Sequence, residues 1–187
     1  MFRGTFYRRF VLGEWAAAEG LVYDFFGPEL VQPVPESLDG PWYISCDYGT
    51  VNPTSMGLWG QKGGVWYRTA EFYYDSRKTG RQQTDGEYAD DLARLAGGRV
   101  VLDPSAASFR EELIRRGWTV YRAENEVLSG IRRTAELLRA GQLVICSPCE
   151  DAIREFGLYR WDTAATGDRV VKEHDHPMDD IRYFAVT

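Results

Sequence analysis

Residues 42–53 read WYISCDYGTVNP, an apolar run that ends in a carboxylate and is followed at once by turn residues. The run at 42–47 predicts a buried strand, and Gly49, Asn52 and Pro53 predict that the chain turns directly after it. Further strands are expected at 54–60 and 65–74, joined by the hairpin turn QKGG. Three strands with short links predict an antiparallel meander.

After residue 85 the pattern changes, because apolar residues recur at helical spacing and the expected helices alternate with short strands. Helices are expected at 86–96, 105–116, 127–140, 148–156 and 177–185, and strands at 99–103, 118–121 and 143–146. Ser105 is the expected N-cap of its helix, and a late hairpin is expected to pair 159–161 with 169–172. This order predicts an α/β fold: a mixed five-stranded sheet, with three antiparallel strands before parallel β-α units, helices on both faces, and an auxiliary hairpin before the C-terminal helix.

The bulk composition is that of a globular domain. The chain has 187 residues, 44% of them hydrophobic and 27% charged, which is enough for one domain with a full core. No apolar run approaches the roughly 18 residues that a membrane helix needs, and the first residues lack the pattern of a secretory signal. The net charge of -6 does not attract DNA at long range, so nucleic-acid binding would depend on a local basic patch, on metal ions or on another part of the protein.

Three aspartates stand where carboxylates are expected to converge. Asp47 and Asp103 each end an apolar strand, and Asp179 lies on the closing helix. Acidic side chains seldom pack against a core without a partner, and hard divalent cations are the usual partner of several carboxylates. Together they predict a site for two cations that carries out phosphodiester chemistry. Taken singly, Asp47 also suits a turn cap and Asp103 suits a position near a helix N-terminus.

The C-terminal stretch supplies further candidates for this site. His176 and Asp179 are three residues apart and share one helix face. Asp175 and Asp179 are four apart and would repel each other without a cation nearby. Spacing alone leaves open whether Asp179 or Asp180 is the ligand. Lys172 is a candidate contact for the scissile phosphate.

Other motifs are weaker or missing. Cys146 and Cys149 form a CxxC motif at a strand end, which we interpret as packed, reduced thiols because little chain remains to build a thioredoxin-like sheet. No Walker A sequence is present, so this chain should not hydrolyse ATP. Arg77, Lys78 and Arg81 form a basic loop that either contacts phosphates or serves solubility.

Several of these stretches resemble motifs of one family. Residues 43–53, with Leu58-Trp59-Gly60 after them, resemble the first strand of the nuclease domain of tailed-phage terminase large subunits. Residues 101–106 are similar to its second acidic motif, and 175–183 (DHPMDDIRY) to its D-H-x-x-D-A-x-R-Y ending. The lead-in at 9–15 and 19–23 resembles the stretch that joins the ATPase motor to the nuclease.

The resemblance implies an RNase H-like fold and an endonuclease that uses two Mg²⁺ or Mn²⁺ ions to cut concatemeric viral DNA during packaging. It implies Asp47, Asp103 and Asp179 as catalytic metal ligands and His176 as an accessory ligand. Lys172 matches a lysine often found before the third motif. Asp180 stands where the family usually has a small residue, which leaves open whether it is a further metal ligand.

The resemblance also implies a domain division and partners. Residues 1–40 would be a lead-in from an ATPase domain that this chain lacks, and residues 41–187 the nuclease domain. The expected partners are double-stranded DNA, that ATPase domain, the portal and the small terminase subunit, with no membrane. The expected place of action is the host cytoplasm, outside the virion.

Three alternatives remain open on the sequence. A structure-selective nuclease, like a Holliday-junction resolvase, would prefer branched DNA to linear duplex. A non-catalytic module that docks on a motor or portal would bind no Mn²⁺ and cut no DNA. A thiol oxidoreductase would cycle Cys146 and Cys149 between dithiol and disulfide.

Overall fold

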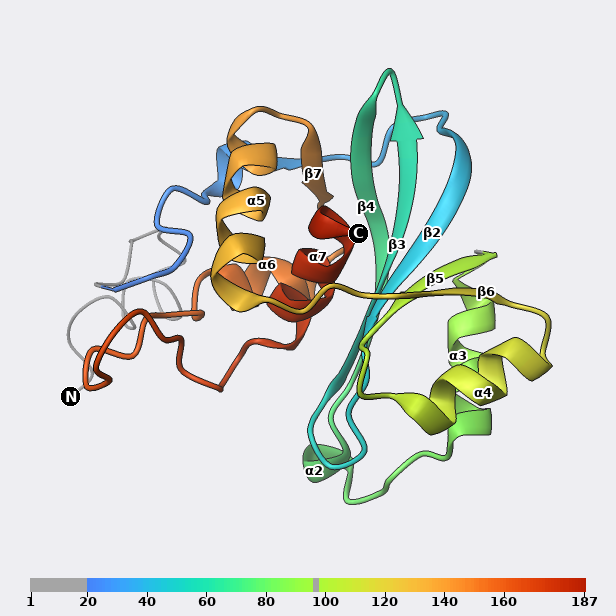
Figure 1. Cartoon of the computed structure of the whole chain (residues 1–187). Helices are drawn as coiled ribbons and strands as arrows, with labels where there is room; N and C mark the ends of the chain where they lie inside the picture. The colour runs from blue at the N-terminus through green and yellow to red at the C-terminus, as the bar shows by residue number, and fades with distance from the viewer. Residues whose placement is uncertain (1–19, 96–97) are drawn as a thin grey trace.

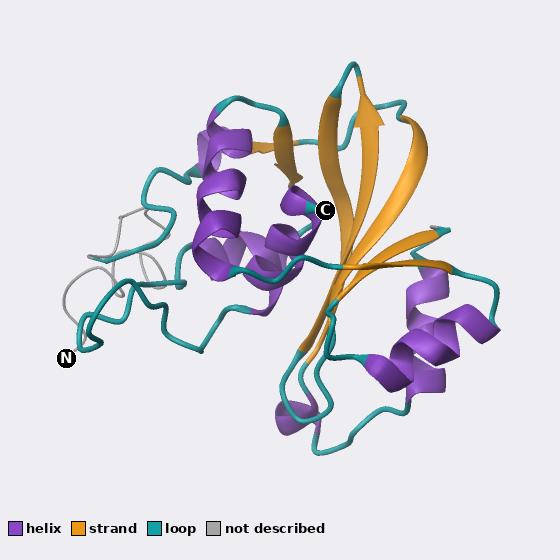
Figure 2. Ribbon diagram, in the orientation of Figure 1, coloured by secondary structure: helices purple, strands orange, loops and turns teal. Residues whose placement is uncertain are grey.

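The structure is a computed structural model that describes residues 20–95 and 98–187. A twisted sheet runs through the molecule with helices on both faces (Figures 1 and 2). One face carries α3 (Asp85–Arg94) and α4 (Ala107–Arg115), and the other carries α5 (Val127–Arg139), α6 (Glu150–Phe156) and α7 (His176–Val186). The predicted α/β architecture is confirmed. The lead-in motif at 9–15 lies outside the described residues.

The meander forms the centre of the sheet. β2 (Asp39–Asp47), β3 (Thr54–Lys62) and β4 (Val65–Tyr74) are antiparallel neighbours, as expected. β5 (Arg99–Leu102) and β6 (Thr119–Arg122) extend the sheet in parallel beyond β2, and β7 (Leu143–Cys146) runs parallel to β4. Within the described ranges the sheet has seven strands rather than five, in the order β1-β7-β4-β3-β2-β5-β6. All six strands whose ranges were predicted belong to this sheet, so five was an undercount; the seventh is the edge strand β1 (Val31–Gln32), which pairs with β7.

The register between β2 and β5 sets the position of two predicted site residues. Cys46 of β2 is the partner of Leu102 of β5, and the two strands are parallel. The backbone N–H of Asp103 donates to the carbonyl of Cys46 at 3.1 Å. Asp47 and Asp103 therefore leave adjacent strands at the same edge of the sheet, which is where open α/β sheets bind their ligands.

Part of the expected lead-in is packed into the domain. Tyr23 and Phe26 are 1% and 5% exposed, and both lie in the core cluster on the α5 and α6 side of the sheet. The ring of Phe26 stacks on that of Phe156 at 3.9 Å. A 3₁₀ helix (Pro28–Leu30) then leads into β1. Residues 20–32 thus contribute to the core instead of only connecting to it; a link to an ATPase domain stays a prediction.

Local details differ from the expectation in three places. α4 begins after Ala106 rather than Ser105, because the side chain of Ser105 bonds Asp103 instead of capping the helix. The polar stretch after β4 contains α2 (Ser76–Thr79), whose N-cap Asp75 accepts from the backbone N–H of Arg77. The late hairpin is reduced to a single antiparallel bridge between Trp161 and Val170. Among the described helices, none is long and apolar enough to cross a membrane.

We expect Phe26→Ala to lower the free energy of unfolding by about 3 kcal/mol, since a large buried ring would leave a cavity. Val34→Ala is the control, because Val34 follows directly after this segment but is 41% exposed. Urea unfolding of both variants measures the difference. Equal stability of the two would contradict the packing of residues 20–32 into the core.

Candidate active site

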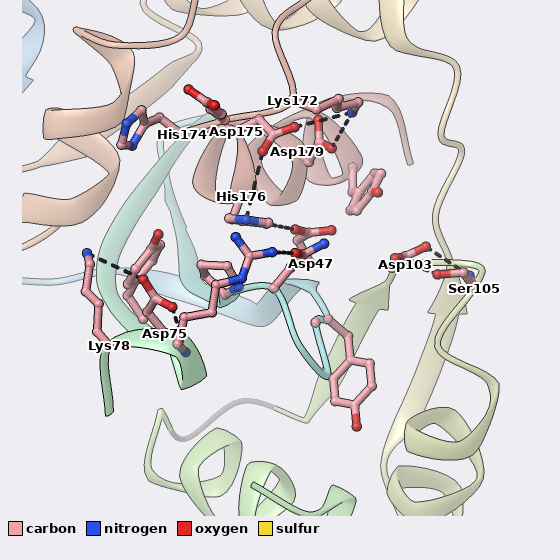
Figure 3. Close-up of a pocket in the computed structure, with 18 of the residues that line it drawn as sticks. Asp47, Asp75, Lys78, Asp103, Ser105, Lys172, His174, Asp175, His176 and Asp179 are labelled. Carbon is pink, nitrogen blue, oxygen red and sulfur yellow. Dashed lines mark hydrogen bonds and ion pairs between the residues drawn. The ribbon is translucent and has the colours of Figure 1, made fainter. Parts of the chain in front are cut away.

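A cavity of about 700 Å³ opens where β2 and β5 end and the first turn of α7 begins. It is lined by Asp47 from β2, Asp103 from the residue after β5, and Asp179 from α7 (Figure 3). His176 and Lys172 line the same cavity. Five of the six predicted site residues are therefore brought together by elements that are far apart in the sequence.

Asp47 lies at the buried side of the cavity. Its Oδ2 is 2.8 Å from Nδ1 of His176. Burial raises the pKa of Asp47 to about 7; the hydrogen bond from His176 opposes this rise, while the negative charges of Asp179 and Asp103 add to it. Burial lowers the pKa of His176, but the bond to Asp47 and the charges of Asp47 and Asp175 outweigh burial and raise it overall. The pair is poised to share a proton.

Asp103 is held by a local turn. Its Oδ1 accepts from the backbone N–H of Ser105 at 2.9 Å, and its Oδ2 accepts from the hydroxyl of Ser105 at 2.8 Å. Such a turn fixes a short side chain against its own backbone. Asp103 is thus fixed at the rim of the cavity by neutral donors rather than by a cation.

Asp179 has a positively charged partner on each oxygen. Its Oδ1 accepts from Nη2 of Arg182 at 2.9 Å, and its Oδ2 lies 3.4 Å from Nζ of Lys172. The same Nζ lies 3.4 Å from Oδ2 of Asp175. The sequence predicted that Asp175 and Asp179 need a cation nearby, and Lys172 lies between them. Its side chain stays 63% exposed, so it is also accessible to a substrate.

Asp180 does not join this group. It is fully buried and does not line the cavity. Its Oδ1 accepts from the hydroxyl of Ser45 at 2.7 Å, and its Oδ2 accepts from Nη2 of Arg68 at 3.0 Å and from the hydroxyl of Ser55. Both oxygens therefore face the sheet and have protein partners. The structure does not support Asp180 as a metal ligand, and we leave it out of the proposed set.

The sequence analysis did not identify several residues of the site. Tyr73 of β4 and Arg154 of α6 line the cavity, and no motif marks either of them. Arg182 bonds Asp179, and its spacing of three residues on one helix was the available signal.

Of the predicted basic loop, Arg77 and Lys78 line the cavity, whereas Arg81 pairs with Glu87 outside it.

The donor set suits hard cations, because carboxylate oxygens are the ligands that Mg²⁺ and Mn²⁺ prefer. In the part of the chain that the structure describes, however, no three His, Cys, Asp or Glu side chains are grouped closely enough to hold one ion. Each proposed ligand is instead satisfied by a protein donor: His176 for Asp47, Ser105 for Asp103, and Arg182 for Asp179. Binding of a cation would require these partners to be exchanged.

The two cysteines of the CxxC motif are free and buried. Burial raises the pKa of Cys146 to about 11 and that of Cys149 to about 12. The thiol of Cys149 donates to the carbonyl of Arg68 at 3.3 Å. Because the thiolate is the reactive form, these shifts argue against a thiol oxidoreductase.

Comparison with known proteins identifies the family. No protein-family model and no curated protein matches the chain. Among solved structures, the large terminase of a thermophilic bacteriophage, in complex with ADP, is 42% identical and superimposes with a TM-score of 0.85. The chain belongs to the large terminase family. The match covers 98% of this terminase chain and 48% of the other, so the chain spans about half the length of this relative.

Two separate nuclease domains share the fold. The nuclease domain of the P22 large terminase superimposes with a TM-score of 0.73 at 18% identity, over 90% of this chain and 92% of that one. The large terminase nuclease of thermophilic phage G20c with bound magnesium gives 0.67 at 16% identity, over 90% and 97%. The terminase chain described here thus has the RNase H-like fold of terminase nuclease domains, as the resemblance implied.

Glu155 lies behind the cavity wall, where it contacts the lining residues Tyr73 and Arg154. It is fully buried on α6, and its Oε1 accepts from the hydroxyl of Tyr73 at 3.0 Å. Burial raises its pKa from 4.5 to about 7, against the lowering effect of Tyr73 and Arg154. Protonated Glu155 is therefore favoured by folding. The stability it contributes is complete below about pH 4.5 and is lost as the pH rises through about 7.

We expect Glu155→Gln, which cannot ionise, to gain stability relative to the parent as the pH rises. From about pH 4.5 to pH 8, the free energy of unfolding of Glu155→Gln should rise by about 3 kcal/mol relative to that of the parent. Urea unfolding at both pH values measures this change. Glu111→Gln, at a side chain that is 73% exposed, is the control. A difference between Glu155→Gln and the parent that does not change with pH would contradict the assignment.

Proposed function

We propose that this terminase domain is a metal-dependent DNA endonuclease that cuts concatemeric viral DNA during genome packaging. The observation that carries the proposal is the meeting of Asp47, Asp103 and Asp179 in one cavity, from β2, the end of β5 and α7. Three carboxylates that could hold two cations, with basic side chains beside them, suit phosphodiester hydrolysis.

The three aspartates would hold two Mg²⁺ or Mn²⁺ ions. We propose that both ions would share Asp47, because its carboxylate is close enough to interact with the charges of both Asp179 and Asp103. Asp103 and Asp179 would each hold one ion, with His176 as an accessory ligand. The ions, when bound, supply a Lewis acid that activates water and offsets charge on the phosphate.

Basic residues on the cavity wall would hold the DNA strand. Lys172 reaches into the cavity beside Asp179, where it can support the scissile phosphate. Arg77 and Lys78 on α2 and Arg154 on α6 line the wall and can contact neighbouring phosphates. His176 holds Asp47 in place through its 2.8 Å contact, and a bound cation would have to take over that contact.

The net charge of -6 suits a nuclease that depends on its assembly. An acidic domain binds DNA weakly by itself, so an attached motor and a procapsid would supply the local DNA concentration. We therefore propose an N-terminal ATPase domain, the portal and the small terminase subunit as partners, with duplex DNA as the substrate. The place of action would be the host cytoplasm, where packaging occurs.

We expect Asp47→Ala to abolish nicking of supercoiled plasmid in Mn²⁺, because the shared ligand is lost. Its circular dichroism and unfolding midpoint should stay close to those of the parent protein. Glu173→Ala is the matched control: Glu173 lines the same cavity but is not a proposed ligand, and this variant should still nick. Undiminished cleavage by Asp47→Ala would defeat the assignment.

We expect Lys172→Met to separate metal binding from cleavage. Removal of a cation that lies 3.4 Å from both Asp175 and Asp179 should keep or strengthen Mn²⁺ binding. Cleavage should nevertheless fall by about 10²-fold, since a charge that supports the phosphate is gone. Titration calorimetry and single-turnover cleavage measure the two quantities. Weaker Mn²⁺ binding with an unchanged cleavage rate would oppose the proposed role of Lys172.

The substrate preference distinguishes the proposal from its rivals. A packaging endonuclease should cut linear duplex at least as well as a four-way junction of the same sequence. A strong preference for the junction would favour a resolvase-like enzyme, and the absence of both Mn²⁺ binding and cleavage would favour a docking module.

A further inference from the structure

α7 lies along β2 in a register of three contacts. His176 bonds Asp47 at 2.8 Å, and Asp180 accepts from Ser45 at 2.7 Å. The rings of Phe184 and Tyr43 follow, with centroids 6.2 Å apart. The contacts advance by four residues on the helix and by two in the opposite direction on the strand.

This register is physically consistent, because the two steps have nearly the same length. Four helical residues rise about 6 Å, and two strand residues rise about 6.6 Å. Alternate residues of a strand point to one face, so Ser45 and Asp47 both face α7. Residues four apart on a helix share one side, so His176 and Asp180 both face the sheet.

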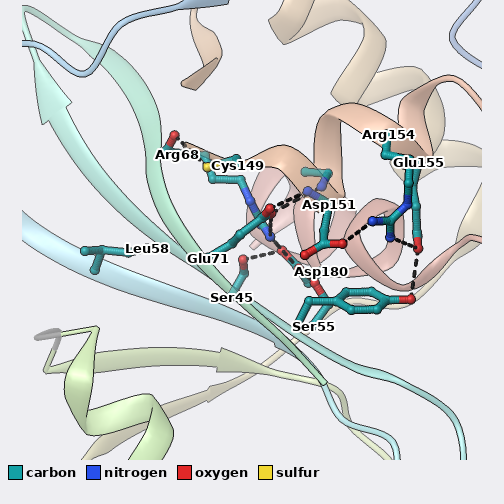
Figure 4. A network of polar contacts seen from close by, with 12 residues as sticks. Ser45, Ser55, Leu58, Arg68, Glu71, Cys149, Asp151, Arg154, Glu155 and Asp180 are labelled. Atoms are coloured by element: carbon teal, nitrogen blue, oxygen red, sulfur yellow. Dashed lines mark hydrogen bonds and ion pairs between the residues drawn. The ribbon is translucent and has the colours of Figure 1, made fainter. Parts of the chain in front are cut away.

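The central contact is a buried ionic network (Figure 4). Asp180 and Arg68 are both 0% exposed, and the guanidinium of Arg68 donates to both oxygens of Asp180. Ser55 and Ser45 donate to the same carboxylate from β3 and β2. Gly57 provides the space, since a Cβ there would collide with the guanidinium of Arg68.

The central contact is the one that resists displacement. The imidazole of His176 is 17% exposed and could exchange its bond for one with water, and the ring contact of Phe184 tolerates small shifts. Separating a buried carboxylate from its arginine leaves two buried charges without a partner, which costs a large free energy. A bidentate arginine–carboxylate bond also fixes the relative orientation of the two side chains. The rotation of α7 is therefore set mainly by Asp180.

We propose that Arg68 and Asp180 are a positioning pair, which fixes the rotation of α7 so that Asp179 faces the cavity. Asp179 precedes Asp180 by one residue and is turned by about 100° around the helix. With Asp180 directed into the sheet, Asp179 is directed toward Lys172 and the cavity. The inference rests on the proposed function only in that Mn²⁺ binding is one of its two readouts.

The competing explanation is that the pair contributes only to stability. Replacement of a buried ion pair by apolar side chains of similar volume is often neutral or stabilising. The double variant Arg68→Met/Asp180→Leu can therefore stay folded while it loses the directional bond. A purely structural role would leave the position of His176 and the affinity for Mn²⁺ unchanged in this variant.

The experiment measures both readouts in the double variant. The ¹⁵N shift of the His176 ring in metal-free protein reports its bond to Asp47, and His174 serves as an internal reference. We expect the His176 shift to move toward that of a solvent-exposed ring and the affinity for Mn²⁺ to fall at least 10-fold. The control is Arg116→Met/Glu112→Leu, which removes an ion pair between α4 and its C-cap, remote from α7, and should change neither readout.

The outcomes separate this inference from the proposed function. If the double variant is folded and its His176 shift is unchanged, the positioning role is overturned, whether or not the affinity for Mn²⁺ has changed. If the parent protein binds no Mn²⁺, the proposed function is overturned. The His176 shift of the metal-free double variant would still test whether Arg68 and Asp180 position α7. If the double variant does not unfold cooperatively, Arg68→Lys replaces it. Lysine keeps the charge but loses the two-pronged bond, so a smaller change of both readouts is expected and no change would overturn the role.

Discussion

Negative charge concentrated at one edge of the sheet is the constraint on which the other features of this domain depend. Asp47 and Asp103 leave adjacent parallel strands, and α7 brings Asp179 against them. Like charges in a partly buried cavity repel, and the structure offsets them in different ways. Asp47 has its contact with His176, Asp179 has the two cationic side chains of Arg182 and Lys172, and Asp103 has the neutral donors of Ser105. These are the interactions that divalent cations would replace.

The position of α7 determines whether this charge is gathered at all. The helix and its N-cap carry three acidic side chains with three different surroundings: the N-cap Asp175 beside Lys172, Asp179 in the cavity, and Asp180 inside the sheet. The close approach of α7 to α5 depends on Gly130, where a Cβ would collide with Arg182. The same arginine bonds Asp179, so helix packing and site geometry are coupled through one side chain.

Much of this arrangement follows from the sequence. Asp47 and Asp103 were predictable because each ends an apolar strand, and parallel strands bring their ends to one edge. The choice between Asp179 and Asp180 was not predictable, because it depends on Arg68, which lies 112 residues earlier in the chain. The burial of Tyr23 and Phe26 was missed because neighbouring prolines interrupt any periodic pattern. Arg154 was missed because a surface arginine on a helix has no distinguishing spacing.

The central claim is that Asp47, Asp103 and Asp179 bind divalent cations together. Crystals of the domain soaked in Mn²⁺, with anomalous scattering recorded at the manganese edge, test this claim most directly. We expect anomalous peaks in the cavity, in contact with all three aspartates, and displacement of the His176 ring from Asp47. A cavity without a peak at saturating Mn²⁺, or peaks only at other surface carboxylates, would contradict it.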